Sequence, residues 1–584
     1  MIGLHLALLL LPDSGAPPAG NRTHGFFQPL RHGVVFWQEK TPEQAIAELE
    51  KVKAQGFNLI AQSSWVWTLP KPGSDLEKVM QAELKWCDEN DFRFFLLHNI
   101  QYGSPGEGGN LDDAWEDPLR AAPLLEDWVR VLQGHPCADG VILGNEVSPI
   151  VGDPKENPKW WAGFTEAMRR RYATVEALNR SWGTRFDSWE KLGPPPRGSI
   201  GRIDLERFAA EAFNRFYGTL FEKVLRPALG PLEYGTKSAG DPILQRRLTR
   251  FSVIGWDDVL ANYPQWRIKA MCDIGRRLDR PVYNSELHLY NDDYVYNQSV
   301  PMSRYRYFTS ALNGETTTAS FAWNMWKKPE TIEVHSHTAA ILAELRRLEP
   351  QLRRFAAQPA ELHVLLTPAY TEGDDTDPET KPLAEQLYAQ MAMLGRSWEF
   401  VGEEDVGAIT SGTLVIPEQP RLEPATAQTI THLPKQVRVT CLNEPPTQDD
   451  YGHMLPQSLR LALAARGNVV DSVGGLATPA ADPGRPYNEP TRTDYLWWSE
   501  RKGHFRAPMT YPLLEARRVR DGERWLVAVI NHATSGEPVV AELPWLRQLS
   551  PRRTVELTGK GGEIASGVMA VFGPLDVRVF RYER

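Results

Sequence analysis

An alternation of short apolar runs with amphipathic segments, repeated eight times from residue 33 onward, is the strongest constraint on how this chain can fold. Most of the runs are apolar almost throughout, which is typical of strands buried on both faces of a parallel sheet. Between them, apolar residues recur at helical spacing. The pattern predicts eight strand–helix units, with strands at 33–37, 57–65, 92–99, 140–146, 234–240, 258–263, 282–288 and 316–326.

The first unit shows the local signals most fully. After GVVFW, the segment TPEQAIAELEKVKAQG offers Thr41 as the N-cap, Pro42 at the first helical position and Gln44 for a capping box. Gly56 is suited to the left-handed conformation that ends many helices. The segment therefore predicts one helix between about residues 42 and 55.

Eight such units over about 320 residues, with a long insertion after the fourth, favour a closed (β/α)8 barrel at residues 31–357. An open, doubly wound parallel sheet remains the structural alternative. We find no GxGxxG or GxxxxGK[ST] motif after any predicted strand, which weakens the nucleotide-binding form of that alternative.

The pattern changes near residue 357. ELHVLLTP, LAEQLYAQMAMLG, GTLVIP and QVRVTCLN predict a smaller α/β domain of flavodoxin-like type at 358–475. The segments RWLVAVINHA, PVVAEL, RTVEL and VRVFRY are short, rich in β-formers and separated by turns. They predict a C-terminal β-sandwich at 500–584.

Composition excludes several classes of protein. Hydrophobic residues make up 42% and charged residues 24% of the 584 positions, which is the usual globular mix. The net charge is −9 and no block of Lys and Arg could form a stripe that follows a phosphate backbone, so nucleic acid is not an expected partner. No run of about 18 apolar residues suggests a membrane span.

The N-terminal residues 1–30 contain an apolar run followed by small residues, in MIGLHLALLLLPDSGAPPAG. This resembles a secretory signal or leader, although no Lys or Arg precedes the run. Secretion or export to the periplasm and retention in the cytoplasm both stay open.

The four cysteines, at positions 87, 137, 272 and 441, are far apart, form no CxxC pair and have no cluster of histidines nearby. Buried thiols are the expectation for all four. We therefore expect no metal site and no cofactor.

Two glutamates stand at the ends of predicted barrel strands. Glu146 ends VILGNE in the fourth strand and Glu286 lies in VYNSELH, the seventh. A single Glu at a strand end is usually solvated or a helix cap. Both of these, however, follow apolar strands whose carboxyl ends open onto one face of a barrel, where reacting groups are found. Most glycoside hydrolases use two facing carboxylates, one on each side of the bond that is cleaved.

The Asn-Glu that ends one strand and the Glu that ends another three strands later resemble clan-A glycoside hydrolases. RRYATVEALNRSWGTRFDSW, at 170–189, is more specifically similar to the segment after the fourth strand of family-42 β-galactosidases. The resemblance implies a retaining β-glycosidase acting on an oligosaccharide or glycoside, and it allows a homo-oligomer. In that family the barrel is followed by a smaller α/β domain and a β domain.

The resemblance also implies residue roles. Glu146 would be the acid/base and Glu286 the nucleophile, while Asn145 would hold the sugar 2-hydroxyl. Tyr263, at the end of the sixth predicted strand, would hydrogen-bond the nucleophile, and Trp323 on the eighth would form a sugar platform. The family's cysteine zinc cluster is absent, and the residues at the ends of the first three strands do not match the family's usual sequence.

Four further residues are weaker candidates. Trp65 near the end of the second strand could stack on sugar or pack in the core. His98 and Asn99, ending the third strand, could bind hydroxyl groups, although a core histidine is as good an interpretation. Lys237, near the end of the fifth strand, is expected to form an ion pair with the nearby Asp241 or to be solvated, as Asp241 is.

A second function class remains open. A carbohydrate-binding or scaffold protein could keep the barrel but not turn over substrate, because the divergent strand ends would leave the carboxylates without a shaped sugar site. Turnover of aryl glycosides would discriminate between the two.

Overall fold

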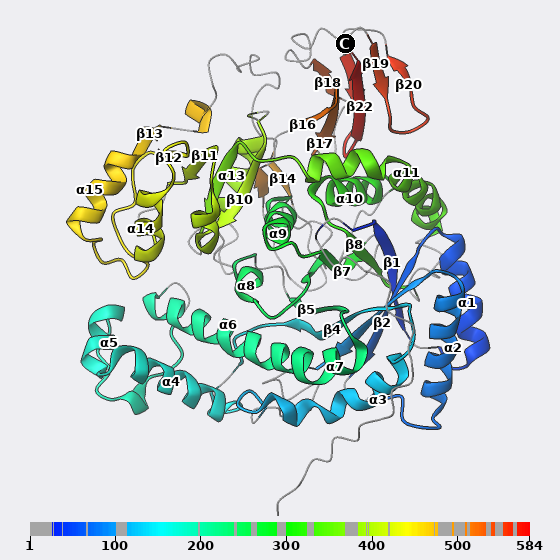
Figure 1. Ribbon diagram of the computed structural model, residues 1–584, viewed down its shortest axis with the longest axis horizontal. Coiled ribbons are helices and arrows are strands. Elements are labelled where there is room, and N and C mark those ends of the chain that lie inside the picture. The colour runs from blue at the N-terminus through cyan, green and yellow to red at the C-terminus, as the bar shows by residue number, and fades with distance from the viewer. Residues whose placement is uncertain are drawn as a thin grey trace, which may run out of the picture.

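The computed structural model describes residues 26, 28–37, 39–65, 68–100, 114–152, 154–196, 199–238, 242–258, 265–288, 300–323, 332–367, 383–392, 394, 396–418, 421–471, 473–476, 493–495, 508–510, 514–532, 539–542, 553–564 and 569–583. Within these residues no helix is both long enough and apolar enough to cross a membrane. Figure 1 shows three parts: a barrel with its helices, a smaller domain beside it, and strands of the C-terminal region next to α10 and α11.

Eight parallel strands form a closed barrel in chain order, with β1 pairing with β8. The barrel prediction is confirmed and the open-sheet alternative is wrong. The strands are β1 (Arg31–Trp37), β2 (Leu59–Trp65), β3 (Arg93–Asn99), β4 (Ala138–Val147), β5 (Glu233–Ser238), β6 (Ile254–Asp258), β7 (Val282–His288) and β8 (Thr317–Phe321).

The helices that cover the barrel begin and end close to the predicted signals. In the first, Thr41 caps the helix by accepting from the Gln44 N–H, Pro42 is the first residue, and Gly56 has φ +86°. The described helices are α1 (Pro42–Ala54), α2 (Asp75–Glu89), α3 (Pro123–Leu132), α4 (Pro158–Tyr172), α5 (Val175–Trp182), α6 (Ile200–Leu220), α7 (Arg226–Leu229), α8 (Pro242–Arg247), α9 (Gln265–Leu278), α10 (Val300–Asn313) and α11 (Ile332–Ala356).

The prediction for the sixth strand was wrong. We expected it at 258–263, whereas β6 is Ile254–Asp258. Its position follows from pairing with β7, because Ile254 aligns with Val282 and Trp256 with Asn284, and Trp256 is fully buried. The eighth strand is also shorter than expected, since β8 ends at Phe321.

Side chains on alternate strand positions fill the barrel interior, as parallel barrels require. They form an apolar cluster separate from the one between strands and helices. The interior residues are Val35, Leu59, Ala61, Phe95, Leu97, Ile142, Val253, Tyr283, Ala319 and Ala322.

The second part is a five-stranded parallel sheet in the order β10-β9-β11-β12-β13. Counted along this domain the order is 2-1-3-4-5, the flavodoxin-like arrangement, so the predicted class is confirmed. Its elements are β9 (Leu362–Leu366), α13 (Leu383–Ala392), β10 (Trp398–Gly402), β11 (Thr413–Ile416), α14 (Pro424–His432), β12 (Arg438–Leu442), α15 (Gln457–Arg466) and β13 (Gly467–Val470).

Helix α9 is shared between this sheet and the barrel. Trp266 and Ala270 pack in the core of the smaller domain, whereas Ile268 and Ile274 pack against the outer face of the barrel. At the same boundary Arg276 and Arg277 of α9 pair with Glu399 of β10. One helix therefore belongs to two hydrophobic cores.

The C-terminal β-sandwich contains an antiparallel sheet in the order β16-β17-β22-β19-β20 and a separate β18–β21 pair. Another short pair, β14–β15, precedes it. The strands are β14 (Thr493–Tyr495), β15 (Pro508–Thr510), β16 (Leu514–Asp521), β17 (Arg524–Asn531), β18 (Val539–Glu542), β19 (Arg553–Glu556), β20 (Gly562–Ile564), β21 (Met569–Phe572) and β22 (Val577–Glu583).

Candidate active site

Glu146 lies at an irregular end of β4. The pairing of β4 with β5 shifts between Leu143 and Val147, and within this interval Gly144 has φ +82° and Glu146 φ +49°. A Cβ on Gly144 would lie 2.5 Å from Val147 Cγ1, so only glycine fits there. A positive φ is uncommon for glutamate, and such bulges turn side chains in a new direction next to functional sites.

Glu286 lies at a matching irregularity in β7. The pairing of β7 with both β6 and β8 shifts between Asn284 and Leu287. The Glu286 backbone N–H donates to Asn284 Oδ1 at 3.3 Å. Both candidate carboxylates are thus placed by breaks in otherwise regular barrel strands.

Lys237 of β5 links the two carboxylates. Its Nζ lies 2.5 Å from Glu286 Oε1 and 3.5 Å from Glu146 Oε1, and it donates to Asn145 Oδ1 at 2.6 Å. Because both carboxylate oxygens contact one nitrogen at these distances, they lie no more than about 6 Å apart. The structure brings Asn145, Glu146 and Glu286 together around one cation.

The three charged groups differ in their access to solvent. The Lys237 side chain is 2% exposed, Glu286 is 11% exposed and Glu146 is 51% exposed. A buried ammonium close to a buried carboxylate forms a strong, charge-assisted contact. Glu286 is therefore held in place, whereas Glu146 faces solvent.

The sequence signal for Lys237 was present but weak. Its side chain follows Glu233 and Gly235 on the same face of β5, because alternate residues of a strand share a face. A lysine on the interior face of a barrel strand indicates a partner within the barrel. Lys237 is ion-paired, with Glu286 and Glu146 as partners that the sequence did not indicate, whereas Asp241 lies outside the described residues.

Exposed aromatic rings lie at the same ends of neighbouring strands. Trp37 at the end of β1 is 38% exposed and packs edge-on against Phe321 of β8, while Trp65 at the end of β2 is 43% exposed. Trp65 aligns with Asn99 at the end of β3, which is buried. Exposed indoles and an amide are suited to sugar faces and hydroxyl groups.

Trp323 does not lie where the resemblance placed it. The chain leaves β8 after Phe321, the Trp323 N–H donates to Val35 O, and the indole Nε1 donates to Glu48 of α1 at 2.8 Å. The side chain packs in the layer between barrel and helices. Its role as a sugar platform is therefore corrected, because the ring faces α1 and is 6% exposed.

His98 also points away from the barrel interior. It is fully buried, Nδ1 hydrogen-bonds Ser64 Oγ at 2.8 Å, and the ring packs against Trp128 of α3. Burial lowers the pKa of His98 to about 4, so the ring is neutral. Its interpretation as a core histidine replaces that of a hydroxyl ligand.

Tyr263 lies outside the described residues, so its predicted contact with the nucleophile stays a prediction. The strand that was expected to carry it ends at Asp258.

The segment at 170–189 contacts helix α6 and, through it, the smaller domain. Tyr172 Oη and Trp182 Nε1 both donate to Asp204 Oδ2, at 2.5 and 2.9 Å. Tyr451 of the smaller domain donates to the other oxygen at 2.7 Å. Tyr172 and Trp182 of the segment thus take part in the contact between the insertion after β4 and the smaller domain.

The opposite end of the interior holds a second charged cluster. Arg31 pairs with Asp139 and with Glu233, each at 2.7 Å, and its side chain lies against Phe95. Burial acts to lower the pKa of Arg31, but the charges of Glu233 and Asp139 outweigh it and raise that pKa. Burial raises the pKa of Glu233, although the positive charge of Arg31 acts to lower it.

No protein-family model matches the chain, and no curated protein matches it by sequence. Solved structures match it over nearly its whole length. An exo-carrageenase GH42 from Bacteroides ovatus has a TM-score of 0.66 at 15% identity, covering 97% of this chain and 85% of its own. A β-galactosidase from Bacillus circulans sp. alkalophilus has a TM-score of 0.66 at 13% identity, covering 96% of this chain and 100% of its own.

A more distant match is α-L-fucosidase isoenzyme 2 from Paenibacillus thiaminolyticus, with a TM-score of 0.54 at 10% identity, covering 95% of this chain and 100% of its own. The barrel and the two domains after it therefore share their fold with these glycoside hydrolase structures, one of which is described as GH42.

Proposed function

We propose that this protein is a retaining glycoside hydrolase that cleaves β-glycosidic bonds of a galactoside-like substrate. The carrying observation is the contact of both Glu146 and Glu286 with one lysine nitrogen at the carboxyl ends of β4 and β7. Carboxyl groups about 5–5.5 Å apart suit double displacement, whereas inversion needs about 6.5–9.5 Å. The limit of about 6 Å between the two oxygens supports retention.

In the proposed reaction, Glu286 attacks the anomeric carbon while Glu146 gives its proton to the leaving oxygen, so that the glycosidic bond breaks as the ester bond forms. Glu146 then takes a proton from water, which attacks the same carbon and releases Glu286. The exposure of Glu146 suits a group that meets both the leaving group and water. Asn145 is positioned beside them to bind a sugar hydroxyl.

Lys237 is a positioning residue in this proposal. Its charge stabilises the ionised form of the nucleophile, and its bond to Asn145 holds the amide that would contact the sugar. Because Nζ lies between the two carboxylates, productive binding requires the sugar to share this space or to move the side chain.

The position of Lys237 between the two carboxylates also supports an alternative function without catalysis. If Lys237 stays between Glu146 and Glu286, a sugar could bind at the aromatic rings without reaching them, and the protein would be a carbohydrate-binding or scaffold protein.

One experiment tests both functions. The purified protein would be treated with 2-deoxy-2-fluoro glycosides of galactose, glucose, fucose, arabinose and mannose, and the labelled peptide would be mapped. We expect a covalent glycosyl group on Glu286 and turnover of the matching aryl β-glycoside. Binding of the sugars without labelling or turnover would favour the alternative, and labelling of another carboxylate would overturn the assignment of the nucleophile.

A further inference from the structure

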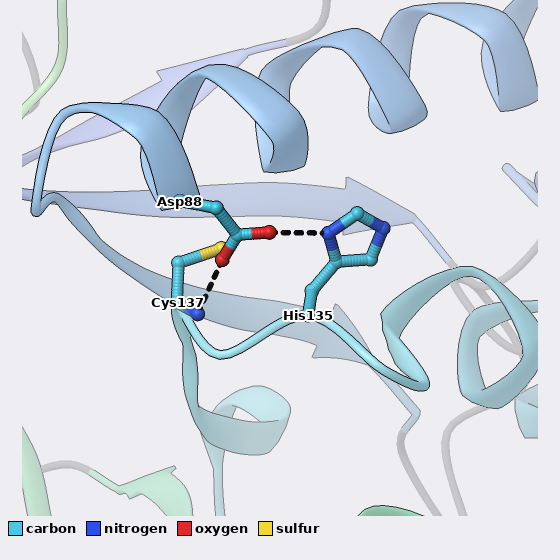
Figure 2. Close-up of side chains that lie close together, drawn as sticks. All are labelled: Asp88, His135 and Cys137. Atoms are coloured by element: carbon cyan, nitrogen blue, oxygen red, sulfur yellow. Dashed lines mark hydrogen bonds and ion pairs between the residues drawn. The ribbon is translucent and has the colours of Figure 1, made fainter. Parts of the chain in front are cut away.

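A second group of reactive side chains lies at the opposite end of the barrel from Glu146. Asp88 is in the last turn of α2, and His135 and Cys137 are in the segment between α3 and β4. Figure 2 shows the three side chains converging, with the Cys137 sulfur beside the Asp88 carboxylate. One potential ligand atom from each residue lies within 4.8 Å of the other two.

Asp88 is the centre of this cluster. One carboxylate oxygen accepts from the Cys137 backbone N–H at 2.7 Å, and the other lies 2.7 Å from His135 Nδ1. The Cys137 thiol contacts Leu84 O at 3.4 Å, which is a weak hydrogen bond. These contacts fix the ends of α2 and β4 relative to each other.

The two ring nitrogens of His135 both face oxygen atoms. Nδ1 faces Asp88 Oδ2, and Nε2 lies 3.2 Å from Gln81 Oε1. A neutral imidazole has one N–H and can donate to only one of these acceptors. A metal ion bound at Nδ1 would leave the N–H on Nε2, where it can donate to Gln81 Oε1. Histidine ligands of metal ions commonly donate their second N–H to such an oxygen.

We propose that Asp88, His135 and Cys137 bind one divalent ion of the Zn²⁺ or Co²⁺ type. An imidazole nitrogen, a thiolate and a carboxylate oxygen are ligands that Zn²⁺ takes in tetrahedral sites. Soft sulfur disfavours Mg²⁺ and Ca²⁺, which prefer oxygen. Binding releases the Cys137 thiol proton to solvent and leaves the single imidazole N–H of His135 on Nε2, towards Gln81 Oε1.

The site is open enough for an ion to enter. Asp88 and His135 side chains are 24% and 18% exposed, whereas Cys137 is buried. Three protein ligands leave a fourth position for water on the exposed side. Cys87 is a close neighbour of the Cys137 thiol. The metal would fasten the end of α2 to the start of β4 and takes no part in the proposed glycoside chemistry.

The sequence signal for this site is the His135-Pro136-Cys137 spacing. We expected buried thiols and no metal because the cysteines form no CxxC pair, and the thiols are buried. The contribution of Asp88, about fifty positions earlier, depends on how α2 packs against the segment before β4.

The test is a Co²⁺ titration of the reduced, metal-stripped, full-length protein. We expect one ion per chain, with a near-ultraviolet thiolate-to-cobalt absorption band that Zn²⁺ abolishes by displacement, and a rise in thermal stability. Cys137→Ser and His135→Gln should each weaken Co²⁺ binding by at least about 100-fold, since even outer partners of metal ligands are worth about 10–100-fold. Cys441→Ser, which removes a buried thiol in another domain, should leave the band unchanged.

A variant that preserves the local hydrogen bond separates metal binding from folding. Asp88→Asn keeps an oxygen to accept from the Cys137 N–H but loses the ligand charge, so it should fold normally in the absence of metal and bind Co²⁺ weakly. No thiolate band in the wild-type protein, or an unchanged band in Cys137→Ser, would overturn the proposal.

Discussion

The two ends of the barrel interior hold clusters of the same composition, two carboxylates and one cation, in different surroundings. At the amino ends of the strands, Arg31, Asp139 and Glu233 are all nearly buried, at 6%, 8% and 0% side-chain exposure. At the carboxyl ends, Lys237 is as buried, but its partner Glu146 is half-exposed. A closed cluster can only hold the strands together, whereas an open one can exchange a partner for a substrate.

One strand contributes to both clusters, since β5 carries Glu233 at one end and Lys237 at the other. The choice of cation also differs. The planar guanidinium of Arg31 binds two carboxylates with separate nitrogens, whereas Lys237 uses a single nitrogen on a flexible chain. Burial and the type of cation, more than the number of charges, therefore distinguish the buried Arg31 cluster from the candidate catalytic cluster around Lys237.

The largest effect should come from Glu286. We expect Glu286→Gln to lower kcat/KM for an aryl β-glycoside by about 10³-fold or more, because the amide cannot act as nucleophile. The amide still offers an oxygen to Lys237, so the variant should remain folded by circular dichroism. Glu146→Gln should lose similar activity on substrates whose leaving group needs a proton. Near-normal turnover in either variant would contradict the assignment.

Substitution in the buried cluster of Arg31, Asp139 and Glu233 should lower the stability of the protein and leave its activity unchanged. Arg31→Met removes the cation from two buried carboxylates and should lower the free energy of unfolding by about 3–5 kcal/mol. Urea unfolding would measure the loss, with Arg31→Lys as the control that keeps the charge. Activity per folded molecule should be close to wild type. An unchanged unfolding midpoint in Arg31→Met would show that the buried Arg31 cluster does not stabilise the barrel.

Substitution of Lys237 should lower activity less than substitution of Glu286 does, and stability less than substitution of Arg31 does. Lys237→Met removes the positive charge beside Glu286, and we expect kcat to fall about 10–100-fold with a smaller change in KM. Its cost in stability should be less than that of Arg31→Met, because Glu146 can turn to solvent. Lys237→Arg should recover part of the activity. Higher activity in Lys237→Met would instead mean that the lysine blocks the site.

A third cluster, at the boundary with the smaller domain, should give the smallest effect. Burial acts to raise the pKa of Glu399, but its hydrogen bond to His363 and the charges of Arg276 and Arg277 lower it to about 2. The folded pKa is below the unfolded value, so this stabilisation is present above about pH 4.5 and is lost as the pH falls towards 2. The difference in unfolding free energy between wild type and Glu399→Gln should therefore shrink from about pH 5 to about pH 3. A difference independent of pH would contradict this.

Local sequence signals predicted the barrel and most of its elements. The capping residues around α1 and the apolar strand runs act within a few residues, so they can be read directly. The sixth strand could not be placed in this way, because apolar residues lie on both sides of Asp257 and Asp258 in the sequence, and its position at Ile254–Asp258 follows from pairing with β7.

The candidate site was predictable in part. Glu146 and Glu286 were marked by their position after apolar strands. The direction of His98 and Trp323 depends on strand alternation and on where the chain leaves β8, which the residue types do not report. Lys237 looked like an ordinary charged residue, because its two partners come from strands that are distant along the chain.

The sharing of α9 has a consequence for how the chain unfolds. Trp266 and Ala270 lie in one core and Ile268 and Ile274 in another, so separating the two domains would strip an apolar face from a helix and expose both cores to water. The smaller domain therefore cannot swing as an independent module, and its melting is coupled to that of the barrel. A fragment that begins at residue 358 would lack the helix that completes its own interior.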